Sequence, residues 1–141
     1  MTLDVSVTDD LAACHAIRRA VFIDGQDVPE ALQVDGLDGE ATHLLARREG
    51  VPIGTLRILR DGDAGKVGRV AVLESERGQG TGAALMRAAE RECRLMGLAR
   101  VTLGSQVHAI PFYERLGYAA HGPVYDDAGI PHRDMTLPLE P

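Results

Sequence analysis

The amino-acid sequence predicts a mixed α/β domain in which a central sheet is flanked by helices. Residues 41–49, 51–60 and 66–73 are strand-like and are separated by glycine-containing turns, which is typical of an antiparallel meander. The third segment leads into a glycine-rich loop, a helix and another buried strand, and a crossover of this kind places its two strands parallel. Because 141 residues is the usual size of one domain, we expect a single domain over residues 1–141.

The N-terminal part is expected to form a strand followed by a helix. Residues 3–7 alternate apolar and polar side chains, as a half-buried strand does. The polar run at 8–10 supplies a helix cap and first-turn carboxylates, and the helix that it begins is expected to reach about Phe22. One face of this helix carries apolar residues at helical spacing, which we expect in the core: Leu11, Cys14, Ile17 and Val21.

The segment from 24 to 40 is rich in glycine, aspartate and proline and carries six carboxylates. A solvated loop with a short turn of helix after Pro29 explains this composition, because loops are commonly exposed and polar. The other interpretation is an acidic lip that receives an amine. The six residues are Asp24, Asp27, Glu30, Asp35, Asp38 and Glu40.

The C-terminal half is expected to alternate helices and strands. Residues 83–96 are strong helix formers with an inward apolar stripe, and Gly97 stands in the C-cap position. A buried strand over 100–104 follows and completes the crossover. A short helix is then expected over 109–116, and two strands near 118–121 and 133–139.

Composition narrows the classes of function. The net charge is −6 without a compensating basic cluster, which argues against a nucleic-acid partner and favours a cationic small molecule or a peptide amine. No apolar run approaches the roughly 18 residues that span a bilayer, and the N-terminus lacks the features of a secretory signal, so we expect a cytoplasmic protein without a membrane partner. Cys14 and Cys93 lack metal-site spacing and are expected as buried thiols, and no metal is expected.

The glycine-rich loop at 77–82 is the most informative stretch of the sequence. A helix N-terminus offers unpaired N–H groups and partial positive charge, and glycines let the backbone approach an anion, so the loop predicts a phosphate site. A P-loop is excluded because no G-K-[ST] follows and Lys66 is the only lysine. A dinucleotide fingerprint fits residues 78–83 formally, but the acidic ribose ligand expected about 20 residues later is absent from 101–105.

Residues 77–82 also match Q/R-x-x-G-x-G/A and resemble the acetyl-CoA loop of the GNAT superfamily of N-acetyltransferases. Residues 69–73 look like the fourth strand of that family, and 110–118 look like its second signature, an aromatic-Tyr-x-basic-x-Gly-aromatic run. The two motifs stand in the right order and are joined by one helix and one strand. Segments 22–29 and 106–113 resemble the ElaA-like branch more narrowly.

The resemblance implies a GNAT-like fold, with a mixed, mostly antiparallel sheet of about six to seven strands splayed between the fourth and fifth. It implies that acetyl-CoA is the cosubstrate, that loop N–H groups bind its pyrophosphate and that the fourth strand pairs with its pantetheine arm. A backbone N–H of Ala71 or Val72 would polarise the thioester carbonyl. The implied cofactor-binding residues are Val70, Ala71, Val72, Arg77, Gly78, Gln79, Gly80, Thr81, Gly82, Gln106, Phe112 and Tyr113.

The family mechanism is direct attack of an amine on the thioester. Tyr113 matches the tyrosine that protonates the departing thiolate. The strand at 66–73 lacks the glutamate that many relatives use as the base. His43, His108 and Glu40 are the candidates for that role, because their side chains can accept a proton directly or through water.

Three functions therefore remain in competition. The first is acetyl transfer from acetyl-CoA to a primary amine of a small molecule or peptide, with a protein N-terminus or lysine as the other acceptor. The second is an acyl-CoA-binding or regulatory module without turnover, because a fold does not dictate a function. The third, a nucleic-acid-directed acetyltransferase, is disfavoured by the acidic charge balance. A homodimer is an open expectation, because folds of this kind often pair.

Overall fold

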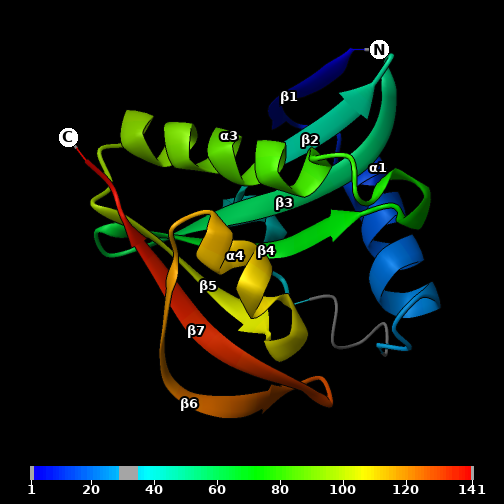
Figure 1. Cartoon of the computed structure of the whole chain (residues 1–141). Helices are drawn as coiled ribbons and strands as arrows, with labels where there is room; N and C mark the ends of the chain where they lie inside the picture. Colours follow the sequence, from blue (N-terminus) through cyan, green and yellow to red (C-terminus); the bar gives the residue numbers. More distant parts are fainter. Residues whose placement is uncertain (1, 29–34, 141) are drawn as a thin grey trace.

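The computed structural model describes residues 2–28 and 35–140, and its centre is one seven-stranded sheet (Figure 1). Residue Glu30 and the expected helical turn after Pro29 lie outside the described residues. The strands follow the order β1-β2-β3-β4-β5-β7-β6 across the sheet. Their bounds are β1 Leu3–Thr8, β2 Thr42–Arg48, β3 Val51–Asp61, β4 Ala64–Val72, β5 Arg100–Gln106, β6 Ala119–Asp127 and β7 Ile130–Pro138.

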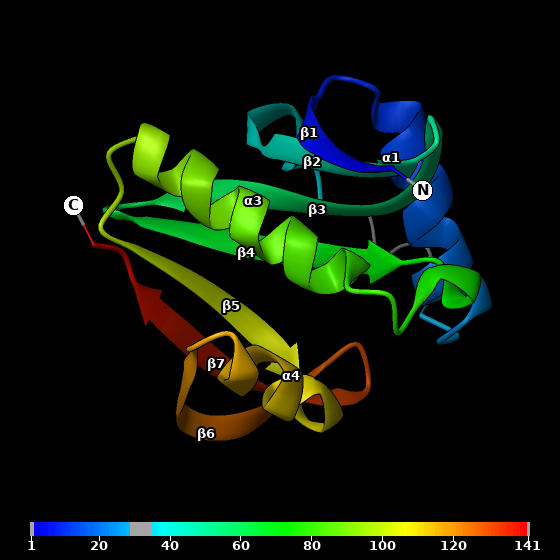
Figure 2. The same cartoon turned by 45° about the horizontal axis from the view of Figure 1, so that its top comes forward.

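The sheet combines antiparallel pairs with one parallel pair, as the sequence predicts. Strands β2 to β4 form the expected antiparallel meander, and β1, the expected N-terminal strand, pairs antiparallel with β2. The parallel pairing of β4 with β5 covers only Ala64–Val67 and Arg100–Leu103. Beyond that stretch the two strands diverge, which Figure 2 shows below α3. The splay implied by the resemblance is therefore present.

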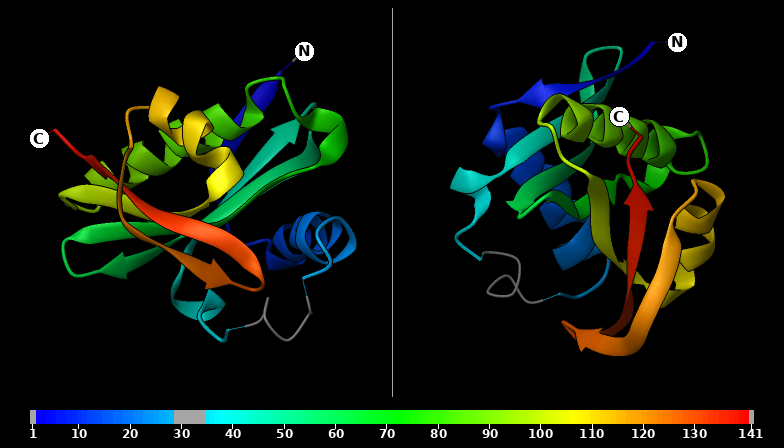
Figure 3. Two further views of the ribbon diagram at one scale, coloured as in Figure 1. Left: turned by 60° about the horizontal axis from the view of Figure 1, so that its bottom comes forward. Right: turned by 90° about the vertical axis from the view of Figure 1, so that its left-hand side faces the viewer.

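Helices cover both faces of the sheet (Figure 3, left). Helix α3 packs on one face together with α4, and α1 packs on the other. Neighbouring residues of β2 show the alternation: Leu44 belongs to the core under α3, and Leu45 to the core under α1. The helices and short turns are α1 Leu11–Arg18, η1 Arg19–Asp24, η2 Asp38–Glu40, η3 Glu74–Glu76, α3 Thr81–Leu95, η4 Val107–Ala109 and α4 Ile110–Arg115.

The N-terminal helix follows its sequence signals closely. The Asp10 side chain caps α1 by accepting a hydrogen bond from the Ala13 N–H at 3.1 Å. The expected stripe is buried at Cys14, Ile17 and Val21, and both cysteines of the chain are buried and free, as predicted.

The last two strands are longer than the sequence analysis expected. Strands β6 and β7 meet at a tight turn in which Ala128 and Gly129 both have positive φ, 55° and 79°. Positive φ at both central residues is the mark of a type I′ hairpin, whose twist suits antiparallel strands. The first of these strands was expected to end at about residue 121, but β6 continues to Asp127 and includes Tyr125.

Candidate active site

A cavity of about 780 Å³ follows the gap between β4 and β5. Its walls come from the glycine-rich loop, the start of α3, both diverging strands, α4 and the β6–β7 hairpin. Segments that are distant in the sequence thus line the same cavity. The parallel pairing ends at Val67 and Leu103, which already line the cavity, so in the described part of the chain the backbone beyond them has no β4–β5 pairing.

The glycine-rich loop directs the N-terminus of α3 into this cavity. Gly78 and Gly80 have φ of 76° and 81°, a left-handed conformation that glycine adopts without steric cost. The first bond inside the helix runs from the Ala84 N–H to the Gly80 carbonyl at 3.0 Å, so the N–H groups just before Ala84 have no partner within the helix. Arg77 joins the loop to β4, because its Nε donates to the Val72 carbonyl at 3.1 Å.

A β-bulge in β4 lies beside the start of the gap. Thr55 pairs with Ala71 and Arg57 with Gly68, so β4 has one residue more than β3 between these pairs. Arg69 lies in the bulge with a φ of 54°, an uncommon conformation for a non-glycine residue. The bulge bends β4 locally, which is the expected cause of its departure from β5.

The backbone direction after the bulge can be read from one hydrogen bond. The Leu73 N–H donates to the Ile53 carbonyl at 2.9 Å and therefore points toward β3. Because N–H directions alternate along a strand, the Ala71 N–H also points to β3 and the Val72 N–H points into the gap. Val72 lines the cavity, whereas the Ala71 side chain is buried in the core under α1.

Tyr113 lies in the cavity wall on α4 and is 8 % exposed. Burial raises the pKa of its hydroxyl to about 12, because the phenolate would lose most of its hydration. The ring makes edge contacts with Phe112 and Tyr118, at centroid distances of 4.9 and 6.0 Å. Phe112 in turn packs against Gly82, where an added Cβ would lie 3.2 Å from the ring. Tyr113 is thus held by aromatic packing next to the start of α3.

The model of the acetyltransferase (GNAT) domain matches residues 7–139, nearly the whole chain. The chain belongs to the GNAT acetyltransferase family. It is 34% identical over 128 residues to YjcF of Bacillus subtilis, described as an uncharacterized N-acetyltransferase, covering 90% of this chain and 91% of the relative. It is 33% identical over 131 residues to ElaA of Escherichia coli, covering 89% of this chain and 86% of the relative.

Solved structures agree with this assignment. An acyl-CoA N-acyltransferase from Pseudomonas aeruginosa superposes with a TM-score of 0.86 at 34% identity, covering 96% of this chain and 99% of the other. The crystal structure of Escherichia coli ElaA superposes with a TM-score of 0.84 at 29% identity, with the same coverage. The GNAT fold, which the two sequence motifs predicted, and the likeness to ElaA, which segments 22–29 and 106–113 predicted, are therefore confirmed.

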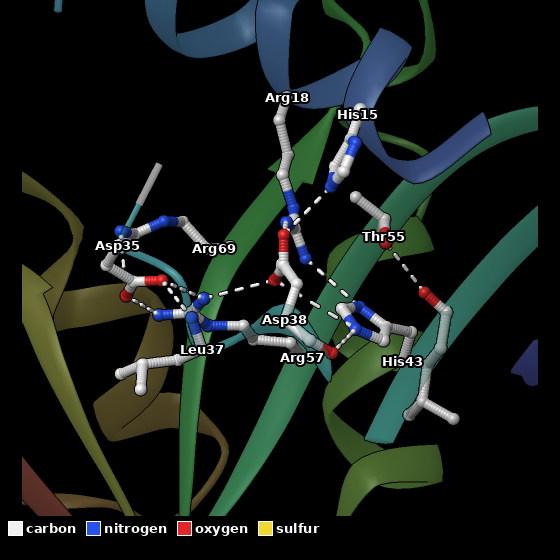
Figure 4. Close-up of polar contacts among 10 residues, drawn as sticks. His15, Arg18, Asp35, Leu37, Asp38, His43, Thr55, Arg57 and Arg69 are labelled. Atoms are coloured by element: carbon white, nitrogen blue, oxygen red, sulfur yellow. Dashed lines mark hydrogen bonds and ion pairs between the residues drawn. The ribbon is translucent and has the colours of Figure 1, made fainter. Parts of the chain in front are cut away.

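In this GNAT domain a cluster of arginines and aspartates borders the α1 side of the cavity (Figure 4). Arg57 is only 4 % exposed, and its Nη1 donates to Asp35 at 2.9 Å and to Asp38 at 3.1 Å. Arg18 donates twice to Asp38, at 2.9 and 3.0 Å. Arg69 reaches Asp35 at 3.4 Å. The chain before β2 is tied to the sheet through these contacts.

The same contacts control the protonation of the two aspartates. Hydrogen bonds from Arg57 hold the pKa of Asp35 well below its usual range. Burial alone would raise the pKa of Asp38, but hydrogen bonds from His15 and Arg18 outweigh it and hold that pKa well below its usual range as well. Both carboxylates are therefore ionised at any ordinary pH.

The described carboxylates of segment 24–40 do not form an acidic lip that could receive an amine. Asp35 and Asp38 accept hydrogen bonds from arginines instead. Asp24 and Asp27 are exposed and are absent from the described cavity lining. Local sequence does not reveal these aspartate–arginine pairs, because their partners are about 20 residues apart.

The three candidate bases lie in different surroundings. His43 is 4 % exposed; its Nδ1 accepts from Arg18 at 3.2 Å and its Nε2 donates to the Asp38 carbonyl at 2.9 Å. With both ring nitrogens engaged, His43 has no lone pair left for a substrate, which argues against its role as the base. Glu40 is exposed and, among the described residues, is not part of the cavity lining. His108 is exposed and does line the cavity.

The wall of the cavity formed by β5, β6 and β7 contains one expected residue and two that were not expected. The expected residue is Gln106, which donates to the Gln26 side chain at 3.0 Å. Beside it, Tyr125 from β6 crosses over Gly104, where any Cβ would collide with the tyrosine hydroxyl, and donates to Asp134 at 2.8 Å. His132 from β7 stacks on Tyr125 with a centroid distance of 6.0 Å. The expected strand boundaries hid this group, because Tyr125 fell outside them.

No helix in residues 2–28 and 35–140 is long and apolar enough to cross a membrane. Within the same ranges, no group of three or more histidine, cysteine, aspartate or glutamate side chains is arranged to hold a metal ion.

Proposed function

We propose that the protein is an N-acetyltransferase that transfers the acetyl group of acetyl-CoA to a primary amine by direct attack. The observation that carries this proposal is the continuity of one cavity, which joins the open N-terminus of α3 to Tyr113 across the gap between β4 and β5. A donor that binds by its phosphates at one end would present its thioester near the tyrosine. The acyl-CoA N-acyltransferase from Pseudomonas aeruginosa, similar over nearly the whole chain, supports an acyl-CoA donor.

The donor end has the features that a pyrophosphate requires. In the proposed complex, backbone N–H groups from Gln79 to Gly82 bind the phosphates, with help from the dipole of α3. Of these residues, Gly80, Thr81 and Gly82 line the cavity, and Gln79 is exposed outside the described lining. Arg77 and Gly78 shape the loop from its other side.

The pantetheine arm is proposed to lie along Val70 and Val72, whose strand has no partner on the gap side. Its amides would then pair with β4 as a short extra strand. The Val72 N–H points into the gap and is the donor that we propose for the thioester carbonyl, in preference to Ala71. A fixed backbone donor of this kind stabilises the oxyanion without reorganisation and is worth about 3–4 kcal/mol in comparable enzymes.

Tyr113 is proposed as the general acid. Its raised pKa of about 12 keeps the proton on the oxygen throughout the working pH range, so the group is always ready to donate to the departing thiolate. Phe112 and Gln106 complete the wall of the donor site. The acceptor is an amine of a small molecule or peptide.

The test is release of coenzyme A from acetyl-CoA across a panel of primary amines, with acetyl-CoA binding measured by calorimetry. Tyr113→Phe should lower kcat by about 10²-fold or more, because it removes the acid, and change the Kd of acetyl-CoA by less than about twofold. Tyr118→Phe is the matched control: it removes the hydroxyl that donates to the buried Glu90 at 2.9 Å and should lower stability, not kcat.

Each alternative function predicts a different pattern. Tight acetyl-CoA binding without turnover on the whole panel would favour an acyl-CoA-binding module. Turnover only with protein N-termini or lysines would shift the acceptor class. Failure to bind acetyl-CoA would overturn the assignment of the glycine-rich loop.

A further inference from the structure

We propose that His132 is the catalytic residue that accepts the proton from the attacking amine. The inference deepens the proposed function, on which it rests, by assigning its missing base to a residue outside the three expected from the sequence. Three observations support this role: the hydrogen bond of the His132 ring, the position of His132 on the sheet, and its contrast with His43 and His108.

One hydrogen bond determines which nitrogen of His132 is available. Nδ1 lies 2.7 Å from the carbonyl oxygen of Ile130. A carbonyl oxygen can only accept, so the Nδ1 nitrogen carries the proton and the neutral ring keeps its lone pair on Nε2. Stacking on Tyr125, with the rings 24° from parallel, holds the ring plane. His132 is thus a held imidazole with one free basic nitrogen, the opposite of His43.

The sheet places His132 on the face opposite to the proposed acid. His132 pairs with Gln106, the last residue of β5, where the strand borders the cavity. Leu103 and Met135 face the core under α3, to which Tyr113 also belongs. Because side chains alternate along a strand, His132 lies on the other face, the one that carries α1. A thioester in the gap would therefore have Tyr113 on one face of the sheet and His132 on the other, so the amine could attack from the face that carries His132.

The proton balance of the reaction suits this arrangement. The amine nitrogen forms a bond to the thioester carbon and becomes positively charged, and Nε2 of His132 takes one proton from it. Collapse of the intermediate breaks the C–S bond, and the sulfur, which keeps the electron pair, receives the proton of Tyr113. The products are the amide and the thiol of coenzyme A. The imidazolium then loses its proton and the phenolate regains one through solvent, which restores the starting state.

Other charged and titratable groups share the cavity with His132. The cavity lining contains Tyr125 and Asp127 on β6, Lys66 and Arg69 on β4, Arg57 on β3, Asp35 before β2, Glu76 and Arg77 before α3, His108 on η4 and Tyr113 on α4. Asp134, on the strand of His132, accepts the Tyr125 hydroxyl. His108 is the competing base. It is exposed on a short 3-10 turn, whereas His132 is partly buried and held by a hydrogen bond and a stacked ring.

The experiment compares His132→Gln and His108→Gln with His121→Gln as the control. His121 is exposed on β6, binds Thr136 and, among the described residues, is outside the cavity lining. His132→Gln should lower kcat by about 10²- to 10⁴-fold, which is the usual contribution of a general base, while the Kd of acetyl-CoA stays within about twofold. The control should keep kcat.

The pH profile separates catalysis from a structural role. A general base can accept a proton only when it is unprotonated, so wild-type kcat/KM should have an acidic limb at which it falls with falling pH. Protonation of the acceptor amine can also produce an acidic limb, so the profile is measured with two acceptors whose amines differ in pKa. A limb caused by the amine moves with the acceptor, whereas a limb caused by the enzyme stays at the same pH. The His132→Gln variant should lose the limb caused by the enzyme. Its survival in His132→Gln, or its loss in His108→Gln alone, would overturn the assignment.

A second measurement does not need turnover. Nitrogen-15 NMR of the histidine rings near neutral pH should find the proton of His132 on Nδ1 and Nε2 unprotonated; the reverse tautomer would overturn the proposal. If the wild type acetylates no amine at all, the proposed function falls, and the catalytic role of His132 falls with it. Amine turnover with an unaffected His132→Gln variant overturns the role of His132 alone.

Discussion

His43 and His132 are both histidines, but their hydrogen bonds differ in whether a ring nitrogen remains available to accept a proton. Both ring nitrogens of His43 are engaged, one with Arg18 and one with a backbone carbonyl, and the ring is buried among charged partners. His132 has one nitrogen engaged and lines the cavity. Hydrogen-bond geometry, which no local sequence pattern encodes, thus decides whether a histidine can act as a base.

At the residue scale, Asp38 gives a prediction about acid stability. Its pKa is lowered in the folded state, so it stabilises the fold above the pKa of about 3.9 that it has when unfolded, and this contribution is lost as the pH falls below that value. The Asp38→Asn variant should be less stable than wild type at pH 7, by about 1–3 kcal/mol, because Arg18 and Arg57 lose a charged acceptor.

Urea unfolding at pH 7, 5 and 3 measures this effect. The difference between wild type and Asp38→Asn should shrink between pH 5 and pH 3. Asp4→Asn, at an exposed position on β1, is the control and should follow the wild type throughout. A constant difference at all three pH values would show that Asp38 acts through packing and not through its charge.

At the scale of elements, β4 has to serve two purposes along its length. Its first half pairs with β5 and packs under α3, and its second half, after the bulge at Arg69, leaves β5 and opens the gap. Gly65 marks the packed half. A Cβ there would collide with the sulfur of Cys93 on α3 and lie 3.2 Å from Leu98.

Gly65→Ala should therefore destabilise the fold by about 1–3 kcal/mol, which is the usual cost of overpacking a filled core. Gly68→Ala is the matched control, because a Cβ at that position meets nothing within 4 Å. Chemical denaturation of the two variants measures the difference. Equal stability of both would mean that α3 shifts freely on the sheet.

At the scale of the whole molecule, the cavity is made by contributions from both faces of the sheet. The loop and α3 approach from one side, and the hairpin of β6 and β7 approaches from the other. A ligand that fills this space would bind the native state and not the unfolded chain. Ligands of that kind stabilise a protein in proportion to the logarithm of their concentration.

Coenzyme A at about 100 times its Kd should accordingly add about 2.7 kcal/mol of stability and raise Tm by roughly 5–10 °C in a domain of this size. A thermal melt followed by circular dichroism measures the shift. Adenosine, which lacks the pyrophosphate, is the control ligand and should leave Tm unchanged at the same concentration. An equal shift with adenosine would place the binding energy outside the glycine-rich loop.

Much of this protein was determined by its sequence alone. The N-cap and apolar stripe of α1, the meander and the crossover through 77–82 follow from local patterns, because backbone preference and side-chain periodicity act over a few residues. Two motifs in the right order were enough to predict the family.

Tertiary structure decided the rest. It paired the charges of Asp35 and Asp38 with arginines and engaged His43 in structural hydrogen bonds. It also brought Tyr125 and His132 to the cavity through a hairpin that is longer than expected. These outcomes depend on partners that lie far apart in the chain. Charge, burial and hydrogen bonding at a site are sums over such partners, so they exist only once the chain has folded.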